Sequence, residues 1–215
     1  EGGVCVTHDS QLALRLQAIR NHAENIVGNA PIADPVNMIG FNFRLTEMSA
    51  AVGLEQLKKA ESEVHRRQQL AERLTRGLQG LEGLTPPVVR SGCRHVYYVW
   101  ALRMDEKVLG ISRAQFSRAL AAEGFPHFVG YLQPLYMLPV FQRRIAFGRD
   151  GWPFSLTARR YEKGMCPVAE RMYENELICF ETCAYRINND QVEQLIEAVR
   201  KVHGHRAELS TLESV

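Results

Sequence analysis

The longest regular pattern in the chain begins at Thr46, where leucines and other apolar residues recur at three- and four-residue steps as far as Leu81. No proline interrupts this stretch, so the sequence predicts one long amphipathic helix with a bend near Gly53. Glu61 and Gln68 interrupt the apolar face, which argues against a coiled coil. A helix of this length often joins two domains.

Shorter signals precede this helix. The opening residues EGGVCVT alternate apolar and polar side chains behind two glycines, which predicts a strand that belongs inside a larger sheet. We therefore expect that Glu1 is not the natural beginning of the protein. Ser10 is placed to cap a helix that ends at Arg20. Residues 21–40 combine asparagine, glycine and proline, and predict a long irregular loop of a functional or mobile kind.

The pattern changes after Pro86 and Pro87 to that of a small mixed domain. The predicted elements are a strand at 95–104, a helix at 112–123 capped by Ser112, an extended piece at 125–131, an irregular segment at 132–167, a strand at 176–180, and a last helix capped by Asn189 or Asp190. The polar tail from His203 is expected to fray. This order predicts an α+β layer in which helices cover one face of a small antiparallel sheet.

Composition narrows the function classes without selecting one. Hydrophobic residues make up 46% and charged residues 23% of the 215 positions, which is typical of an ordinary soluble globular protein. The formal net charge of +2 is too small to indicate binding to nucleic acid or to an anionic membrane. No apolar run approaches the roughly 20 residues that are needed to cross a bilayer. The five cysteines include no CxxC pair, so we expect no metal site and reduced, mostly buried thiols in a cytoplasmic protein.

Four stretches carry a family resemblance: EGGVCVT, RNHAEN, GFNFRLTEMSAAVGLEQL and CPVAERMYENELICF. Together they resemble the PLP-dependent sugar aminotransferases of the DegT and StrS type, and the third stretch is the most specific. The resemblance implies an α/β parent of PLP-transferase fold type I, similar to aspartate aminotransferase. It divides the chain into the end of the large α/β domain with an active-site loop (1–45), a long linking helix (46–84), a small α+β domain (85–206) and a flexible tail (207–215).

The resemblance also implies that the catalytic lysine lies outside this chain. In the family, EGG closes the segment that carries the lysine which forms the Schiff base with pyridoxal phosphate, so that lysine is expected upstream of Glu1. The lysines present are Lys58, Lys59, Lys107, Lys163 and Lys201, and none matches the family's position. We therefore expect the chain to be the C-terminal portion of such an enzyme and to be inactive by itself.

Asn42 and Arg44 are the cofactor-binding candidates that the resemblance implies. In the family, this loop-to-helix junction reaches across a homodimer interface toward the cofactor phosphate of the partner subunit. Amide and guanidinium donors ahead of a helix N-terminus suit an anion. The residues alone leave another interpretation open, in which Arg44 pairs with Glu47 and Asn42 caps a turn.

His127, Tyr131 and Tyr136 are the substrate-binding candidates. They lie between prolines in the small domain, where their polar tips suit the hydroxyl groups of a sugar or a cyclitol. The tyrosines could equally be packing residues with solvated hydroxyls. The arginine pairs 143–144 and 159–160 could meet a nucleotide diphosphate or simply form solvated surface.

Three functions remain open from the sequence. The leading hypothesis is a homodimeric PLP aminotransferase that moves an amino group from Glu or Gln to a nucleotide-linked keto sugar or a keto-cyclitol. A related enzyme that uses pyridoxamine phosphate to dehydrate deoxysugars has the same family pattern, because the position that separates the two lies outside the chain. The third hypothesis is a non-catalytic dimerising or binding module.

Overall fold

The structure is a computed structural model of the chain, and it describes residues 2–24, 32, 38–181 and 186–211. The chain divides into two units, residues 1–63 and residues 64–215, and helix α2 begins in the first unit and ends in the second. The four-part division expected from the sequence stays a prediction.

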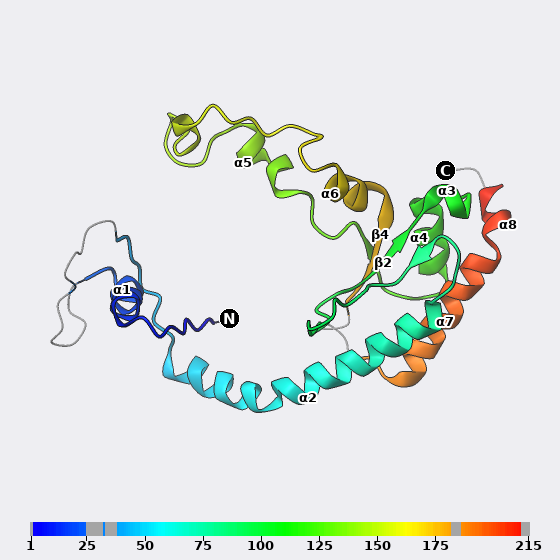
Figure 1. The fold of residues 1–215 in the computed structure, drawn as a ribbon, viewed down its shortest axis with the longest axis horizontal. Helices are drawn as coiled ribbons and strands as arrows, with labels where there is room; N and C mark the ends of the chain where they lie inside the picture. The colour runs from blue at the N-terminus through cyan, green and yellow to red at the C-terminus, as the bar shows by residue number, and fades with distance from the viewer. Residues whose placement is uncertain (1, 25–31, 33–37, 182–185, 212–215) are drawn as a thin grey trace. The chain divides into compact units, whose positions relative to one another are not determined.

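The described elements are drawn in Figure 1. The α-helices are α1 (Ser10–Arg20), α2 (Glu47–Leu78), α3 (Glu106–Leu109), α4 (Arg113–Ala122), α5 (Pro139–Gln142), α6 (Pro167–Arg171), α7 (Asn189–Gly204) and α8 (Arg206–Ser210). The 3-10 turns are η1 (Leu135–Met137) and η2 (Phe154–Leu156), and η3 (Met172–Glu176) is a π-helix. The strands are β1 (Leu84–Thr85), β2 (Trp100–Met104), β3 (Phe128–Val129) and β4 (Leu177–Phe180). The described chain is thus rich in helix with one small antiparallel sheet, which agrees with the expected α+β pattern at that level.

The first unit contains α1 and the start of α2. The carboxylate of Asp9 accepts hydrogen bonds from the backbone N–H groups of Gln11 (2.9 Å) and Leu12 (3.0 Å), so Asp9 caps α1 instead of the expected Ser10. The opening strand expected from EGGVCVT is not assigned within residues 2–7, because alternation alone makes a strand only where another backbone pairs with it. Most of the loop expected at 21–40 lies outside the described residues.

The second unit is built around a sheet with the strand order β1-β2-β4-β3, in which every neighbouring pair is antiparallel. Trp100 stands opposite Phe180, which sets the register of the two central strands. The strand expected at 95–104 starts only at Trp100. Tyr97 has a φ of 49°, and its backbone N–H donates to the ring of His95 at 2.8 Å, so the chain turns before it can join the sheet.

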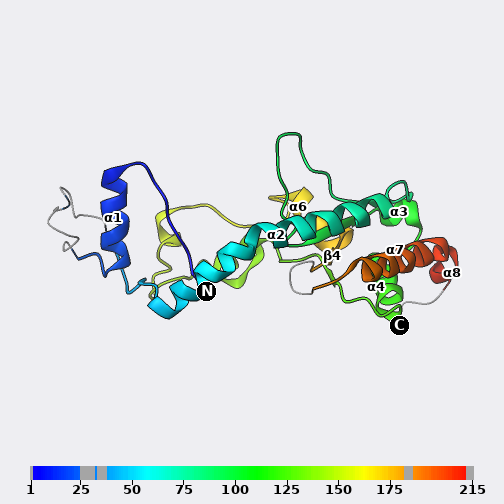
Figure 2. The ribbon, with the colours of Figure 1, turned by 90° about the horizontal axis from the view of Figure 1, so that it is seen from below.

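The core of this unit lies between the sheet and three helices. Along β2 the buried side chains alternate with more exposed ones. The core residues of β2 are Trp100, Leu102 and Met104, and those of α2 are Leu70, Ala71, Leu74 and Leu78. Helices α4 and α7 supply most of the remainder, and α7 lies beside the second half of α2 in Figures 1 and 2. The indole N–H of Trp100 donates to the hydroxyl of Thr75 at 3.1 Å, so this buried donor is satisfied.

The last helices differ from expectation at their ends. Asn188 caps α7 through a capping box with Gln191, so the cap lies one residue before Asn189, the earlier of the two expected caps. The tail does not fray at His203, because α8 follows and the side chain of Gln115 donates to the carbonyl of Leu209 at 3.1 Å. Among the described cysteines only Cys179 is buried, so the expectation of mostly buried thiols is wrong for Cys5, Cys93 and Cys166. The described residues contain no helix that combines the length and the apolar character needed to cross a membrane.

A pair of glycines in α2 tests the packing of α7. A Cβ at Gly77 would lie 2.4 Å from Cδ1 of Ile196 and under 3.0 Å from two further atoms of that buried side chain, whereas a Cβ at Gly53 meets nothing within 4 Å. Gly77→Ala should therefore destabilise the fold by about 1–3 kcal/mol through overpacking. Gly53→Ala should be neutral or stabilise by up to about 1 kcal/mol, because alanine is the better helix former. Melting temperatures of the two variants and the wild type measure this, and an equal response of both variants would contradict it.

Candidate functional site

A short backbone junction presents Asn42 and Arg44. The segment before α2 runs beside the end of α1, where Phe43 donates its N–H to the carbonyl of Arg20 and His22 donates to that of Phe41, each at 3.0 Å. Gly40 makes this approach possible, because a Cβ there would lie 2.4 Å from backbone atoms at the end of α1. The backbone of the junction is therefore held by main-chain contacts, while its side chains are exposed.

Asn42 and Arg44 contact each other. The amide oxygen of Asn42 accepts from the Nε of Arg44 at 2.9 Å and from its backbone N–H at 3.4 Å. This contact uses Nε, so the two terminal nitrogens of the guanidinium are the donors left for an anion. Thr46 then caps α2, since its hydroxyl accepts from the N–H of Ser49 at 3.2 Å. The junction thus places amide and guanidinium groups just ahead of the N-terminus of a 32-residue helix, a donor set that fits a phosphate.

His127 is engaged on both ring nitrogens inside the second unit. Its Nδ1 lies 2.9 Å from the carbonyl of Phe125, which can only accept, so Nδ1 is the donor. Its Nε2 lies 2.7 Å from the hydroxyl of Ser117 on α4. The histidine therefore fastens the turn after α4 to that helix, and its contact with a substrate stays a prediction.

Tyr131 and Tyr136 differ in their surroundings. Tyr131 is 45% exposed with a φ of 71°, and its pKa is raised by partial desolvation and by a hydrogen bond with Tyr98. Tyr136 is half-buried, and its hydroxyl donates to the carboxylate of Glu170. Desolvation and that hydrogen bond raise the pKa of Tyr136 to about 12. Tyr131 is thus the more exposed side chain of the two.

Glu170 is a residue that the sequence analysis missed. It is the buried polar side chain of the described part of the chain, with 7% of its surface exposed. Besides Tyr136, its two carboxylate oxygens accept from the N–H of Gly164 at 2.7 and 2.9 Å. The hydrogen bond from Tyr136 is the main cause that lowers the pKa of Glu170. The only sequence signal for this group was a glutamate inside the CPVAE stretch.

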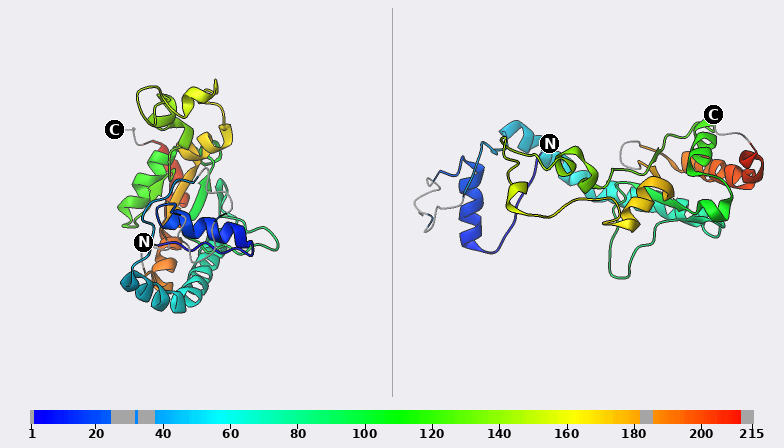
Figure 3. Two further views of the ribbon diagram at one scale, coloured as in Figure 1. Left: turned by 90° about the vertical axis from the view of Figure 1, so that its left-hand side faces the viewer. Right: turned by 90° about the horizontal axis from the view of Figure 1, so that it is seen from above.

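The residues from 131 to 166, here called the connecting segment, join β3 to α6 with only α5 and short turns between them (Figure 3). Side chains satisfy much of its backbone. The guanidinium of Arg144 donates to the carbonyls of Phe154 at 2.5 Å, of Arg159 at 2.6 Å, and of Thr157. Arg144 is therefore occupied in closing its own loop, which disfavours the expected alternative of a diphosphate contact for this arginine.

Three of the lysines and two further histidines have local partners. Lys58 pairs with Glu55, Lys163 with Glu174 and Lys201 with Glu123, and each of these lysines is exposed. The ring of His203 contacts the carbonyl of Glu82 at 2.8 Å, and the ring of His205 contacts Glu208 at 2.9 Å. Within the described residues no group of three or more histidine, cysteine, aspartate or glutamate side chains could hold a metal ion.

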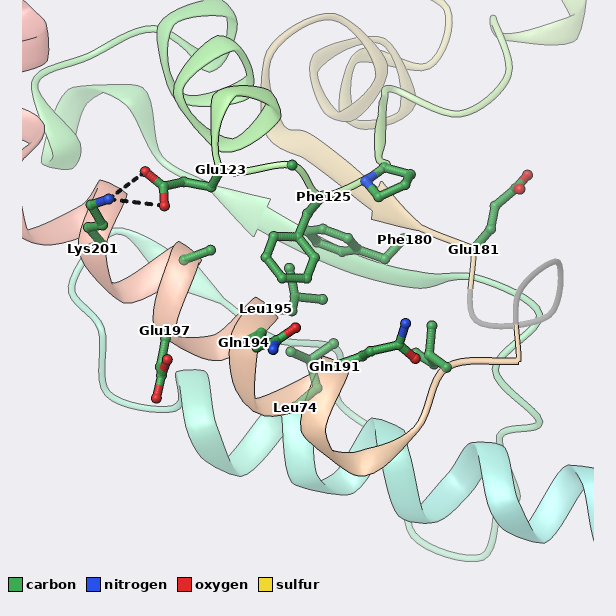
Figure 4. Close-up of a pocket in the computed structure, with 14 residues that line it drawn as sticks. Leu74, Glu123, Phe125, Phe180, Glu181, Gln191, Gln194, Leu195, Glu197 and Lys201 are labelled. Atoms are coloured by element: carbon green, nitrogen blue, oxygen red, sulfur yellow. Dashed lines mark hydrogen bonds and ion pairs between the residues drawn. The ribbon is translucent and has the colours of Figure 1, made fainter.

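A cavity of about 740 Å³ opens between α7, the end of β4 and the turn after α4 (Figure 4). Phe125, Phe180 and Leu195 line its apolar side, and the ion pair of Lys201 with Glu123 lies at one end. None of the five site residues expected from the sequence lines it. His127 adjoins it through Phe125 and Phe180, with its ring 6.1 Å from that of Phe180.

Comparison with known proteins gives the decisive observation, because one family model matches residues 1–200. The chain belongs to the DegT/DnrJ/EryC1/StrS aminotransferase family. Members of this family depend on pyridoxal phosphate. The resemblance inferred from GFNFRLTEMSAAVGLEQL and the other quoted stretches is confirmed.

The chain is also similar to individual proteins, among them the following three. The spore coat polysaccharide biosynthesis protein SpsC of Bacillus subtilis is 26% identical over 94% of this chain and 49% of its own. The L-glutamine:2-deoxy-scyllo-inosose aminotransferase of Streptoalloteichus tenebrarius is 30% identical over 97% of this chain and 51% of its own. The crystal structure of DesV from S. venezuelae has a TM-score of 0.71 at 25% identity, over 92% of this chain and 46% of DesV. The chain thus spans about half the length of the relatives it matches.

Glu170 predicts an acid-dependent loss of stability. Because its pKa is lowered in the fold, its contribution is fully present above the ordinary value of about 4.3 and is lost as the pH falls through the folded value. The melting temperature of Glu170→Gln should therefore lie below that of the wild type at pH 6, and the gap should narrow steadily below about pH 4.

The neighbours of Glu170 do not produce this effect. Tyr136 and Lys163 both have raised pKa values, so neither changes its protonation between pH 3 and pH 7. The ion pair of Glu174 with Lys163 is present in both proteins, so its contribution cancels in the comparison. The exposed Glu162→Gln is the matched control. A gap that stays constant with pH would contradict the assignment.

Proposed function

We propose that the complete protein which carries this chain is a PLP-dependent aminotransferase. It transfers an amino group from Glu or Gln to the ketone of a nucleotide-linked sugar or a cyclitol, and it acts as a homodimer in the cytoplasm. The names of similar proteins support this substrate class, since one is a glutamine-dependent aminotransferase of a keto-cyclitol. The observation that carries the proposal is the donor pair of Asn42 and Arg44 in front of α2, in a chain whose family uses a phosphorylated cofactor.

The proposal gives the residues of this chain the following parts. Arg44 donates from its terminal nitrogens to the cofactor phosphate, and the contact with Asn42 fixes the plane of the guanidinium. The free N–H groups in the first turn of α2 add to the attraction for the anion. Pyridoxal phosphate itself supplies the electron sink for amino transfer, and the lysine that holds it is proposed to lie outside this chain.

In the second unit the proposal assigns substrate contact to the start of the connecting segment. Tyr131 is an exposed side chain whose hydroxyl can donate to or accept from a sugar hydroxyl. Tyr136 keeps acceptor capacity after it donates to Glu170. His127 contributes by holding the turn before β3, because both of its ring nitrogens already have partners.

Removal of the Arg44 guanidinium tests the phosphate assignment. Arg44→Ala in the complete protein should weaken the binding of pyridoxal phosphate by about 10- to 100-fold, the range of a lost charge-assisted hydrogen bond. The binding of pyridoxal, which lacks the phosphate, should hardly change. Absorbance titration with both compounds measures this.

Arg20→Ala is the matched control, because Arg20 is another exposed arginine of the first unit. It should bind pyridoxal phosphate like the wild type. Equal losses in the two variants would make the effect one of general charge and contradict the assignment. A wild-type protein that binds no pyridoxal phosphate would overturn the proposed function itself.

A further inference from the structure

A buried carboxylate, that of Glu170, links the two ends of the connecting segment, which are called its base. Glu170 loses most of its contact with water, and an ionised carboxylate in such a place must be compensated by donors. Two donors come from opposite ends of the segment, the hydroxyl of Tyr136 in η1 and the N–H of Gly164 near α6. One side chain therefore ties together two positions that are 28 residues apart in the sequence.

A second side chain repeats this link beside the first. The amide nitrogen of Gln142 donates to the carbonyl of Tyr136 at 2.6 Å and to that of Tyr161 at 2.9 Å. Tyr136 is thus held at its hydroxyl by Glu170 and at its backbone by Gln142. Neither link depends on a helix or strand ladder, so the base of the segment owes its position to these few polar contacts.

The carboxylate is in turn fixed to the sheet. Glu170 lies in α6, which continues through η3 into β4, an inner strand of the sheet. Arg113 of α4 anchors η3 and the start of β4, because its guanidinium donates to the carbonyls of Tyr173 at 2.7 Å and Leu177 at 3.3 Å. Desolvation of Arg113 lowers its pKa, as expected for a partly buried cation. A shift of Glu170 would therefore require movement at the end of a core strand.

We propose that Glu170 is a positioning residue that fixes the Tyr131–Tyr136 loop for the keto substrate by holding Tyr136 and Gly164 together. The inference rests on the proposed function, which assigns this loop to the substrate. Glu170 touches neither substrate nor cofactor in this arrangement, and it acts through Tyr136. Its loss leaves the donor-binding side of the reaction unchanged and impairs the acceptor side.

The kinetic test uses the complete protein with Glu170→Ala, Tyr136→Phe and the double variant. Glu162→Ala is the control, because it removes an exposed carboxylate two residues from Gly164. The probes are 2-deoxy-scyllo-inosose and a TDP-linked keto-hexose as acceptors, with L-glutamine and L-glutamate as donors. Glu170→Ala should raise the KM of the accepted keto compound about 10-fold or more, because a misplaced loop binds it poorly. The KM of the donor should stay within about 2-fold.

The double variant separates a shared role from two independent ones. If Glu170 acts through Tyr136, the change in KM in the double variant should equal that of Glu170→Ala alone, since the link is already broken. Tyr136→Phe keeps the carboxylate and its contacts with Gly164, so it should fold normally and show part of the effect. If Glu170→Ala fails to fold, the trypsin cleavage rate of Tyr136→Phe decides the question, because a lost substrate contact would not change that rate.

Proteolysis provides a readout that needs no activity. The connecting segment contains the exposed trypsin sites Arg143, Arg149, Arg159 and Arg160. Cleavage there should be about 10-fold faster in Glu170→Ala than in the wild type, and unchanged in Glu162→Ala.

A KM for the keto compound within 2-fold of wild type in both Glu170→Ala and Tyr136→Phe overturns the proposal, as does an unchanged cleavage rate. If the wild type uses neither acceptor and the donors leave the spectrum of the cofactor unchanged, the proposed function fails, and the cleavage rates alone still decide whether Glu170 holds the segment.

Discussion

A backbone that leaves helix and sheet must still satisfy its N–H and carbonyl groups, and this constraint shapes both segments that carry the candidate site residues. In the connecting segment the partners are side chains. The main groups are Glu170 and Gln142 at the base and Arg144 farther along. Charged groups make the stronger hydrogen bonds, so a few of them replace a ladder of many backbone contacts. The connecting segment is thus ordered without regular secondary structure, and its conformation depends on these few side chains.

The same constraint works differently at the junction before α2. There, main-chain contacts with the end of α1 hold the backbone, and Gly40 permits the close approach. The side chains of Asn42 and Arg44 are consequently left for each other and for an anion. Where main-chain groups bond to each other, polar side chains remain available for a ligand. Where side chains satisfy the main-chain groups, those side chains are no longer available. This difference explains why Arg44 is a good phosphate candidate and Arg144 is not.

The sequence predicted what local patterns encode. Ser112 was recognised as the cap of α4, and helices α2 and α7 followed from apolar spacing, with errors of a few residues at their ends. The strand that begins at Trp100 was predicted to start five residues too early, at His95. The positive φ of Tyr97 ends the extended backbone there, and nothing in the amino-acid sequence indicates it. Glu170 was missed because its partners stand 34 and 6 positions away, at no helical or strand period. Such contacts are set by the tertiary fold.

The candidate site residues show where family knowledge exceeds physical reasoning from sequence. Nothing in the spacing of Asn42 and Arg44 specifies a phosphate, and the family resemblance supplied that role before any geometry. The structure adds that the guanidinium is oriented through Nε, which leaves its two-pronged edge for an anion. An exposed guanidinium is screened by salt, so its contact with a phosphate gains strength only where the surroundings exclude water. Under the proposed function, the affinity of this corner for the cofactor phosphate therefore depends on how far the complete protein excludes water from the guanidinium.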